Sequence, residues 1–276
     1  MPSLDDLLRA RRAEREALLW RATDLLAADR RVVAAWLGGS LGRGEADDLS
    51  DLDLWVAVAD EDCPTVVAGR REYASRFGRP LLVLEAPQNA PAGGGYLLTL
   101  YGGKAGPLQV DWYWQPRSTA RMPRQARVLF DRAGLAQEEP PAPLTQHERA
   151  ARVSERVAFF WAMAAITAKK IARGQPWAAL ALLSTVARTL DGVRALLGDD
   201  AGQAGYEDRR SDSPPAEPAA QLAGLRALAR EMESLTPRAL AMGAEVPAEV
   251  VPQAYRFFDL ADALLNGASP AGEGRR

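Results

Sequence analysis

The sequence predicts an α+β fold in two parts: an N-terminal domain with a mixed sheet flanked by helices, followed by a C-terminal helical bundle. Strand-like runs such as RVVAAWLGG and DLDLWVAVA occur only in the first half of the chain. A proline-rich stretch, LAQEEPPAPLTQ, separates the halves, and beyond it the apolar residues recur at helical spacing. We therefore expect a first domain over 1–137, a helical domain over 146–268 and a disordered tail over 269–276.

The first domain is expected to open with a helix. Residues 3–29 predict it, because Ser3 can cap its start and Asp5 and Asp6 suit its first turn. The segment CPTVVAGRREYASRFG predicts one further helix, which ends at Gly78. Strands are expected in RVVAAWLGG, DLDLWVAVA, RPLLVLEA, GGYLLTLYGG, GPLQVDWYWQP and ARVLFDRAG, with the fourth and fifth as a hairpin pair.

The second domain is expected to contain four helices. The first covers ERAARVSERVAFFWAMAAITAKKIARG and ends at Gly174. The second covers PWAALALLSTVARTLDGVRALLG, with Pro176 near its start and Gly198 at its end. Two more helical segments follow, near 217–235 and 247–266.

Composition excludes several kinds of protein. A chain of 276 residues, 47% of them hydrophobic, can bury a large core. Its net charge of -2 argues against a broad basic surface for nucleic acid. Cys63 is the only cysteine, which excludes an intramolecular disulfide and a cysteine-rich zinc site. His147 is the only histidine, so Ser-His-Asp and Cys-His catalysis are excluded unless it serves; its position is more typical of a helix start.

We expect neither a signal peptide nor a membrane-spanning segment. The segment MPSLDDLLRARRAEREALLW is charged throughout and lacks the apolar centre of a signal peptide. No run approaches the roughly 20 apolar residues that a membrane span requires. We expect a soluble cytoplasmic protein that has neither nucleic acid nor membrane as its partner.

The chemistry begins with two aspartates in the second predicted strand. Side chains alternate between the two faces of a strand, so Asp51 and Asp53 project to the same side. Two carboxylates on one face repel each other unless a cation lies between them. Mg²⁺ takes oxygen ligands of this kind. The alternative is that both residues only cap and solvate the entry to the strand.

A glycine-rich turn before these aspartates predicts a phosphate site. Gly38 and Gly39 end the first strand and allow close approach of the backbone to a ligand. Ser40 and Arg43 then stand at a predicted helix start, where exposed amides and a guanidinium favour phosphate. A surface salt bridge is the alternative role for Arg43.

A third carboxylate completes the pattern. Two-metal phosphoryl transfer requires ligands for both ions, and Asp111 in LQVDWYW is the candidate. It lies on the same face as Asp51 and Asp53 if the two strands are adjacent. An exposed acid on an edge strand is the alternative reading of Asp111.

With these motifs together, GGSLGRGEADDLSDLDLWV followed by VDWYW resembles the DNA polymerase β-type nucleotidyltransferase superfamily. The two-domain architecture is most similar to the bacterial nucleotidyltransferases that act on aminoglycosides or lincosamides. The resemblance implies that Asp51 and Asp53 coordinate two Mg²⁺ ions and that Asp111 coordinates one and serves as, or assists, the general base. It also implies ATP as donor.

Further site residues follow from the same resemblance. Gly39 belongs to its Gly-Ser motif, and Ser40 and Arg43 would contact the β- and γ-phosphates. Lys169 and Lys170 could close over the same phosphates, although a solvated helix face is their simpler role. Glu85 and Trp112 are candidate contacts to the acceptor. The alternative for Glu85 is a solvated carboxylate at a strand end, and the alternative for Trp112 is packing in the core. Glu85 is also an alternative to Asp111 as the base.

The sequence thus predicts a Mg²⁺-dependent enzyme that moves a nucleoside monophosphate, AMP from ATP, onto a hydroxyl of a small molecule. An aminoglycoside-like antibiotic is the candidate acceptor, which would make the enzyme a resistance factor. The alternatives are a protein-AMPylating enzyme of the antitoxin type and a non-catalytic nucleotide-binding protein of the same fold. The acceptor, the base preference and the choice between monomer and homodimer stay open.

Overall fold

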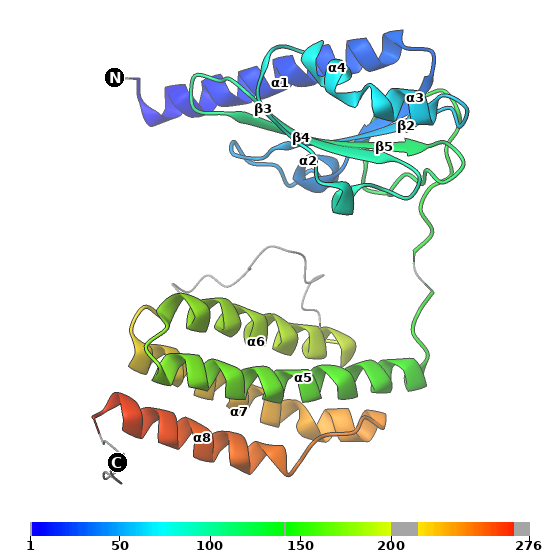
Figure 1. Cartoon of the computed structure of the whole chain (residues 1–276). Helices are drawn as coiled ribbons and strands as arrows, with labels where there is room; N and C mark the ends of the chain where they lie inside the picture. The colour runs from blue at the N-terminus through cyan, green and yellow to red at the C-terminus, as the bar shows by residue number, and fades with distance from the viewer. Residues whose placement is uncertain (1, 141, 200–214, 268–276) are drawn as a thin grey trace, which may run out of the picture. The chain divides into compact units, whose positions relative to one another are not determined.

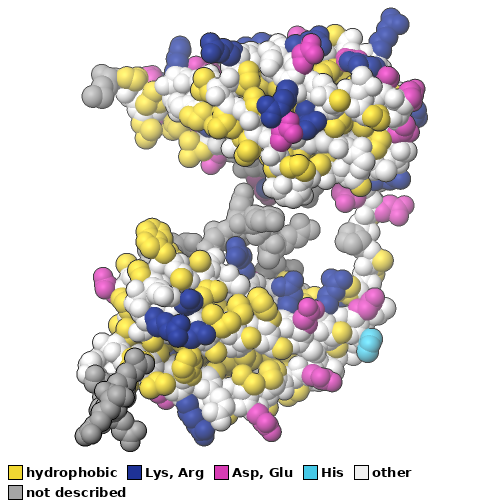
Figure 2. Space-filling model, viewed as in Figure 1, with side chains coloured by type: hydrophobic (Ala, Val, Ile, Leu, Met, Phe, Trp, Pro, Cys, Tyr) yellow, Lys and Arg dark blue, Asp and Glu magenta, His cyan; other side chains and the backbone are white. Residues whose placement is uncertain are grey.

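The computed structural model describes residues 2–140, 142–199 and 215–267. The chain forms two compact units, Met1–Pro141 and Ala142–Arg276 (Figure 1). The predicted tail over 269–276 lies outside the described residues. On the face of the first unit that Figure 2 shows, basic and acidic side chains lie close to one another rather than in patches of one sign. That mixture agrees with the small net charge of the chain.

The first unit is built on one six-stranded sheet with the order β3-β4-β5-β2-β1-β6. β2 and β5 are parallel, and the other neighbouring strands are antiparallel. The sheet is therefore mixed, and the α+β class predicted from the sequence is confirmed. The strands are β1 (Val32–Leu37), β2 (Leu52–Val58), β3 (Pro80–Leu84), β4 (Gly95–Tyr101), β5 (Leu108–Pro116) and β6 (Arg127–Asp131).

Helices cover the two faces of this sheet unequally. α1 (Leu4–Ala28), α3 (Cys63–Ala68) and α4 (Arg70–Ser75) lie on one face, and the short α2 (Gly39–Arg43) lies toward the other (Figure 1). A single-turn 3₁₀ helix, η1 (Pro87–Asn89), precedes β4. Ser3 caps α1 as predicted, and Asp6 completes a capping box with it.

One predicted helix is wrong as a single element. The segment from Cys63 to Gly78 forms two short helices, α3 and α4, which are separated at Gly69. Gly69 has φ -87° and ψ 9°, so its backbone leaves the helical region at that point. Glycine disfavours a continuous helix more than any residue except proline, because its backbone loses the most freedom there.

Strand alternation separates the face of the sheet that packs under the helices from the face that carries the carboxylates. On the helix-covered face, β2 and β5 contribute large side chains to the core beneath α1, α3 and α4, among them Leu54, Trp112 and Trp114. The residues between them project to the opposite face. These include Asp51, Asp53 and Asp111, so the packing of one face determines where the carboxylates point.

The second unit is a bundle of four helices in the part that is described: α5 (Gln146–Ala172), α6 (Pro176–Leu196), α7 (Pro218–Met242) and α8 (Val250–Leu265). All four predicted helices are present. α7 continues beyond its predicted end at 235, through Pro237. Leu235 and Ala239 on either side of the proline are buried in the core, and that packing offsets the backbone hydrogen bond that proline cannot make. No helix among the described residues has the length and apolar character to cross a membrane.

Phe258 is expected to be essential to the stability of this bundle. Its side chain on α8 is fully buried and contacts Tyr255 in an edge-on ring pair. Replacing it with Ala should lower the free energy of unfolding by about 3 to 5 kcal/mol, because the bundle loses apolar contacts and gains a cavity. Urea unfolding followed by circular dichroism measures the change. Leu260→Ala is the control on the same helix: its side chain is 52% exposed, and a loss as large as that of Phe258→Ala would contradict the packing argument.

Candidate active site

Two parallel strands bring the aspartates together. β2 pairs with β5 so that Asp53 stands directly beside Asp111. Asp51 immediately precedes β2, and the Gln109 amide reaches its carboxylate as well as that of Asp111. The adjacency that the prediction for Asp111 required is therefore present. Asp111 is 5% exposed, and Asp51 and Asp53 are partly buried.

Two neighbours hold the Asp111 carboxylate. The Tyr96 hydroxyl, from β4, donates to Oδ1 of Asp111. The Gln109 amide, two residues before Asp111 on β5, donates to Oδ2 of Asp111 at 2.6 Å and to Oδ2 of Asp51 at 3.1 Å. Neither residue was predicted from the sequence. Alternation alone puts Gln109 on the face of Asp111, whereas the antiparallel partner strand that brings Tyr96 there has no sequence signature.

The carboxylates carry negative charge that few nearby cations offset. Burial, followed by the charges of Asp51 and Asp111, raises the pKa of Asp53 to about 6, while Arg43 opposes the shift. Burial also raises the pKa of Asp51, with a further contribution from the charge of Asp111. A divalent cation would relieve this repulsion, and carboxylate oxygens are the ligands that Mg²⁺ prefers.

The carboxylates of the cluster are the type of ligand that binds Mg²⁺, but they are not arranged as a complete coordination site. In the described ranges, no group of three or more His, Cys, Asp or Glu side chains is arranged to hold a metal ion. The Gln109 amide lies between two of the three carboxylates and occupies their oxygens. Binding of a cation therefore requires these side chains to rearrange. Asp51 and Asp53 are only partly buried, so their side chains have room to move.

The glycine turn packs directly against Asp53. The Gly38 N–H donates to the Asp53 carbonyl oxygen at 2.9 Å. Gly39 has φ +55°, and a Cβ built on it would stand 1.8 Å from Oδ2 of Asp53. Only glycine therefore allows both this backbone conformation and the observed position of the carboxylate. Ser40 follows in the first turn of α2, and Arg43 in its last turn pairs with Glu45 at 2.8 Å.

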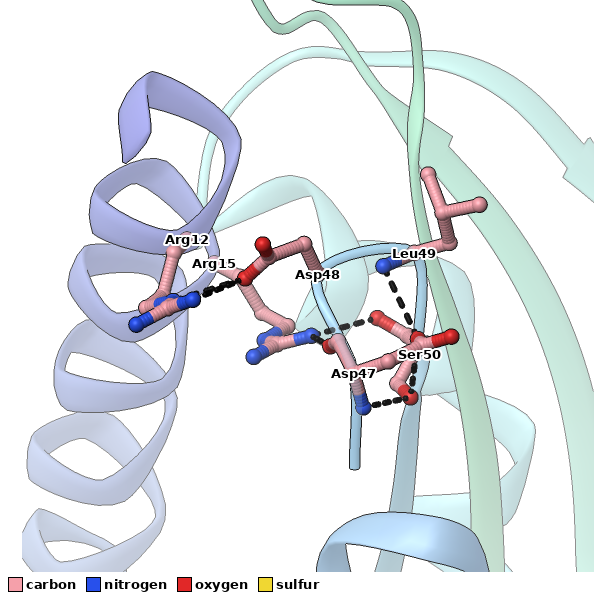
Figure 3. Close-up of polar contacts among 6 residues, drawn as sticks. All are labelled: Arg12, Arg15, Asp47, Asp48, Leu49 and Ser50. Carbon is pink, nitrogen blue, oxygen red and sulfur yellow. Dashed lines mark hydrogen bonds and ion pairs between the residues drawn. The ribbon is translucent and has the colours of Figure 1, made fainter. Parts of the chain in front are cut away.

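The loop that leads into Asp51 is held by α1 (Figure 3). Nη1 of Arg15, a side chain only 6% exposed, donates to the carbonyl oxygens of Asp47 at 2.7 Å and Ser50 at 3.0 Å. The Arg15 charge also lowers the pKa of Asp51 against the effect of burial. Arg12 reaches the Asp48 carboxylate at 2.7 Å. Sequence analysis missed Arg15 because one arginine in a helix rich in charges carries no distinguishing signal.

Arg15→Met is expected to destabilise the first unit. The substitution keeps an unbranched apolar stem but removes the charged donor, which leaves the carbonyl oxygens of Asp47 and Ser50 without their partner. We expect the free energy of unfolding to fall by about 2 to 3 kcal/mol, measured by urea unfolding. Arg12→Met is the matched control one turn away, where the side chain is 62% exposed and an effect below about 1 kcal/mol is expected. Equal losses in the two variants would contradict the role of Arg15.

A row of aromatic rings lies beside the carboxylates on the same sheet face. Trp55 and Tyr113 follow Asp53 and Asp111 by two residues and stack at 4.2 Å between ring centroids. Trp36 and Tyr96 extend the row to the neighbouring strands. The rings limit access of water to one side of the cluster, which strengthens electrostatic interactions there.

Three predicted site residues lie elsewhere in the fold. Trp112 projects to the face opposite Asp111, is 1% exposed and donates from Nε1 to Oγ1 of Thr99 at 3.0 Å. That burial in the core conflicts with its predicted contact to an acceptor. Lys169 and Lys170 are in the last turn of α5, in the second unit, where positive charge suits the helix C-terminus.

Glu85 is also separate from the carboxylate cluster. It follows β3, which is an edge strand two positions from β5. Its carboxylate pairs with Arg70 at 2.7 Å and with Arg71 at 2.6 Å. The pKa of Glu85 is lowered, and its hydrogen bond with Arg71 is the largest cause. These contacts argue against Glu85 as the general base and leave Asp111 as the candidate.

Comparisons with known proteins add a distant structural likeness. No protein-family model matches the chain, and no curated protein matches it in sequence. The crystal structure of an aminoglycoside 6-adenyltransferase from Bacillus subtilis is similar over 90% of this chain and 97% of that chain, at 11% identity and a TM-score of 0.34. That TM-score is too low to bear on fold or function.

Proposed function

We propose that the chain is a Mg²⁺-dependent nucleotidyltransferase that moves a nucleoside monophosphate, AMP from ATP, onto a hydroxyl of a small molecule. One observation carries the proposal: Asp51, Asp53 and Asp111 lie on one face of two adjacent parallel strands, with the Gly38-Gly39 backbone against Asp53. Carboxylates that repel one another beside a close backbone turn suit a cation and a phosphate together.

In this proposal, Asp51, Asp53 and Asp111 would hold two Mg²⁺ ions. When bound, the ions would neutralise charge on the phosphates and make the acceptor hydroxyl more acidic. Asp111 takes the proton of that hydroxyl as its oxygen forms a bond to the α-phosphorus. The bond from the α-phosphorus to the bridging oxygen breaks, and pyrophosphate leaves.

The remaining predicted residues would position the donor. Gly39 leaves space beside Asp53, and Ser40 and Arg43 follow it in α2, so these three would contact the triphosphate. A contribution of Lys169 and Lys170 to phosphate binding stays a prediction. Alanine at either lysine would raise KM for ATP if that prediction holds.

The test is a transfer assay with defined acceptors. The protein is incubated with Mg²⁺, labelled ATP and a panel of aminoglycosides and lincosamides, and pyrophosphate release and product mass are followed. Transfer to a small molecule supports the proposal, and replacing ATP with other nucleoside triphosphates then establishes base preference. Labelling of protein alone would indicate the AMPylating alternative. ATP binding without turnover on any acceptor would indicate a non-catalytic nucleotide-binding protein.

Asp53 is expected to make stability depend on pH. Its pKa is about 6 in the folded protein and 3.8 in the unfolded reference, so folding favours the protonated carboxyl. This contribution is fully present below the unfolded value and is lost as the pH rises through about 6. Without divalent cations, the free energy of unfolding of Asp53→Asn relative to the wild type should therefore increase as the pH rises from about 4 to 6 and level off above that. Urea unfolding in EDTA across this range measures the difference, and a difference that is independent of pH would contradict the assigned shift.

A further inference from the structure

Gln109 occupies an unusual position in the carboxylate cluster. Its amide nitrogen lies 2.6 Å from Oδ2 of Asp111 and 3.1 Å from Oδ2 of Asp51. The NH₂ group of a glutamine has two hydrogens, so one amide can donate to both carboxylates at the same time. Gln109 therefore links two side chains that repel each other, and its partial positive charge offsets part of that repulsion.

A cation that bridges Asp51 and Asp111 through these oxygens needs the same space. Mg²⁺ lies about 2.1 Å from its oxygen ligands, so an ion bound to both would stand between them. The amide nitrogen already stands between them at hydrogen-bond distance. The ion and the nitrogen cannot occupy this position together.

We propose that Gln109 is an internal competitor for the divalent cation: its amide holds Asp51 and Asp111 together and must leave at least one of them before a cation can bridge both. The inference rests on the proposed function, because it assigns the cation to these carboxylates. Gln109 is partly exposed and follows the first residue of β5, so its long side chain has room to withdraw.

Tyr96 provides the contrast. Its hydroxyl donates to Oδ1 of Asp111, the oxygen that Gln109 does not contact, and its side chain is 5% exposed. It has no contact with Asp51 among its hydrogen bonds in the described part of the chain. Asp111 thus has one enclosed partner that fixes the carboxylate and one partner that can be exchanged.

The test uses Mn²⁺ as the probe and the full chain as the protein. The electron paramagnetic resonance signal of free Mn²⁺ falls as the ion binds, which yields a dissociation constant without any turnover. Gln109→Met keeps the length of the side chain and removes the donor, and we expect it to bind Mn²⁺ about tenfold more tightly than the wild type. Tyr96→Phe removes the other hydrogen bond of Asp111 and should bind no more tightly than the wild type. Circular dichroism checks that each variant is folded, with Gln109→Ala as the replacement if Gln109→Met is not.

The outcomes separate this inference from the proposed function. Unchanged or weaker Mn²⁺ binding by Gln109→Met, or equal tightening in Tyr96→Phe, overturns the inference even if the wild type transfers nucleotides. Tighter binding in Gln109→Met alone, together with no transfer to any acceptor, supports the inference and overturns the proposed function. Absence of Mn²⁺ binding in the wild type overturns both.

Discussion

Asp53→Asn is expected to reduce nucleotidyl transfer by roughly a thousandfold, which corresponds to about 4 kcal/mol of transition-state stabilisation. The amide keeps the shape of the side chain but loses the negative charge that a cation between Asp53 and Asp111 requires. Pyrophosphate release with ATP and the identified acceptor measures the loss. Mg²⁺ should raise the unfolding temperature of the wild type, and the same substitution should abolish that rise.

The control for Asp53→Asn is Glu61→Gln. Glu61 is an exposed carboxylate shortly after β2, so its replacement removes the same charge from the same region without touching the cluster. We expect its activity to remain within about twofold of the wild type, because isolated surface charges contribute little. Unchanged turnover in Asp53→Asn would show that no essential cation binds at Asp53.

Gly39→Ala should damage the candidate site although it adds only one methyl group. The new Cβ would stand 1.8 Å from Oδ2 of Asp53, and the residue would have to keep φ +55°. The carboxylate or the turn has to move, and we expect a loss of about 100-fold in kcat/KM because small displacements of catalytic groups are costly. Strain at a left-handed backbone position adds a loss of about 1 to 3 kcal/mol in the free energy of unfolding.

Gly44 offers a matched control for this prediction. It also has a left-handed backbone, with φ +74°, but a Cβ there would meet no atom within 4 Å. Gly44→Ala should therefore show the loss of stability without the loss of turnover. Equal losses of kcat/KM in the two variants would mean that backbone strain, rather than the contact with Asp53, explains the effect.

Much of the first unit could be predicted because its signals are local. The capping pattern at Ser3 marks the start of α1, and alternation in DLDLWV puts Asp51 and Asp53 on one face whatever the strand pairs with. The break between α3 and α4 was missed at Gly69, because a single glycine in a helical pattern is tolerated at a cost of about 1 kcal/mol and need not end the helix.

The candidate site was predictable only in part, for a related reason. Asp111 could be proposed from its strand, but its position beside Asp53 depends on the parallel pairing of β2 with β5 across the sheet. Glu85 and Trp112 were plausible acceptor contacts until their surroundings were known. Glu85 is held by Arg70 and Arg71, and Trp112 is enclosed in the core.

Short-range patterns in the sequence were thus enough to identify the two aspartates, the glycine turn before them and the division into a sheet-containing part and a helical part. Tertiary structure alone decided which partners surround the carboxylates. Tyr96 comes from β4, Gln109 from β5 and Arg15 from α1, each brought to its partner by pairing or packing between elements distant in sequence. Long-range pairing depends on the folding of the whole sheet, so no short stretch of sequence encodes it.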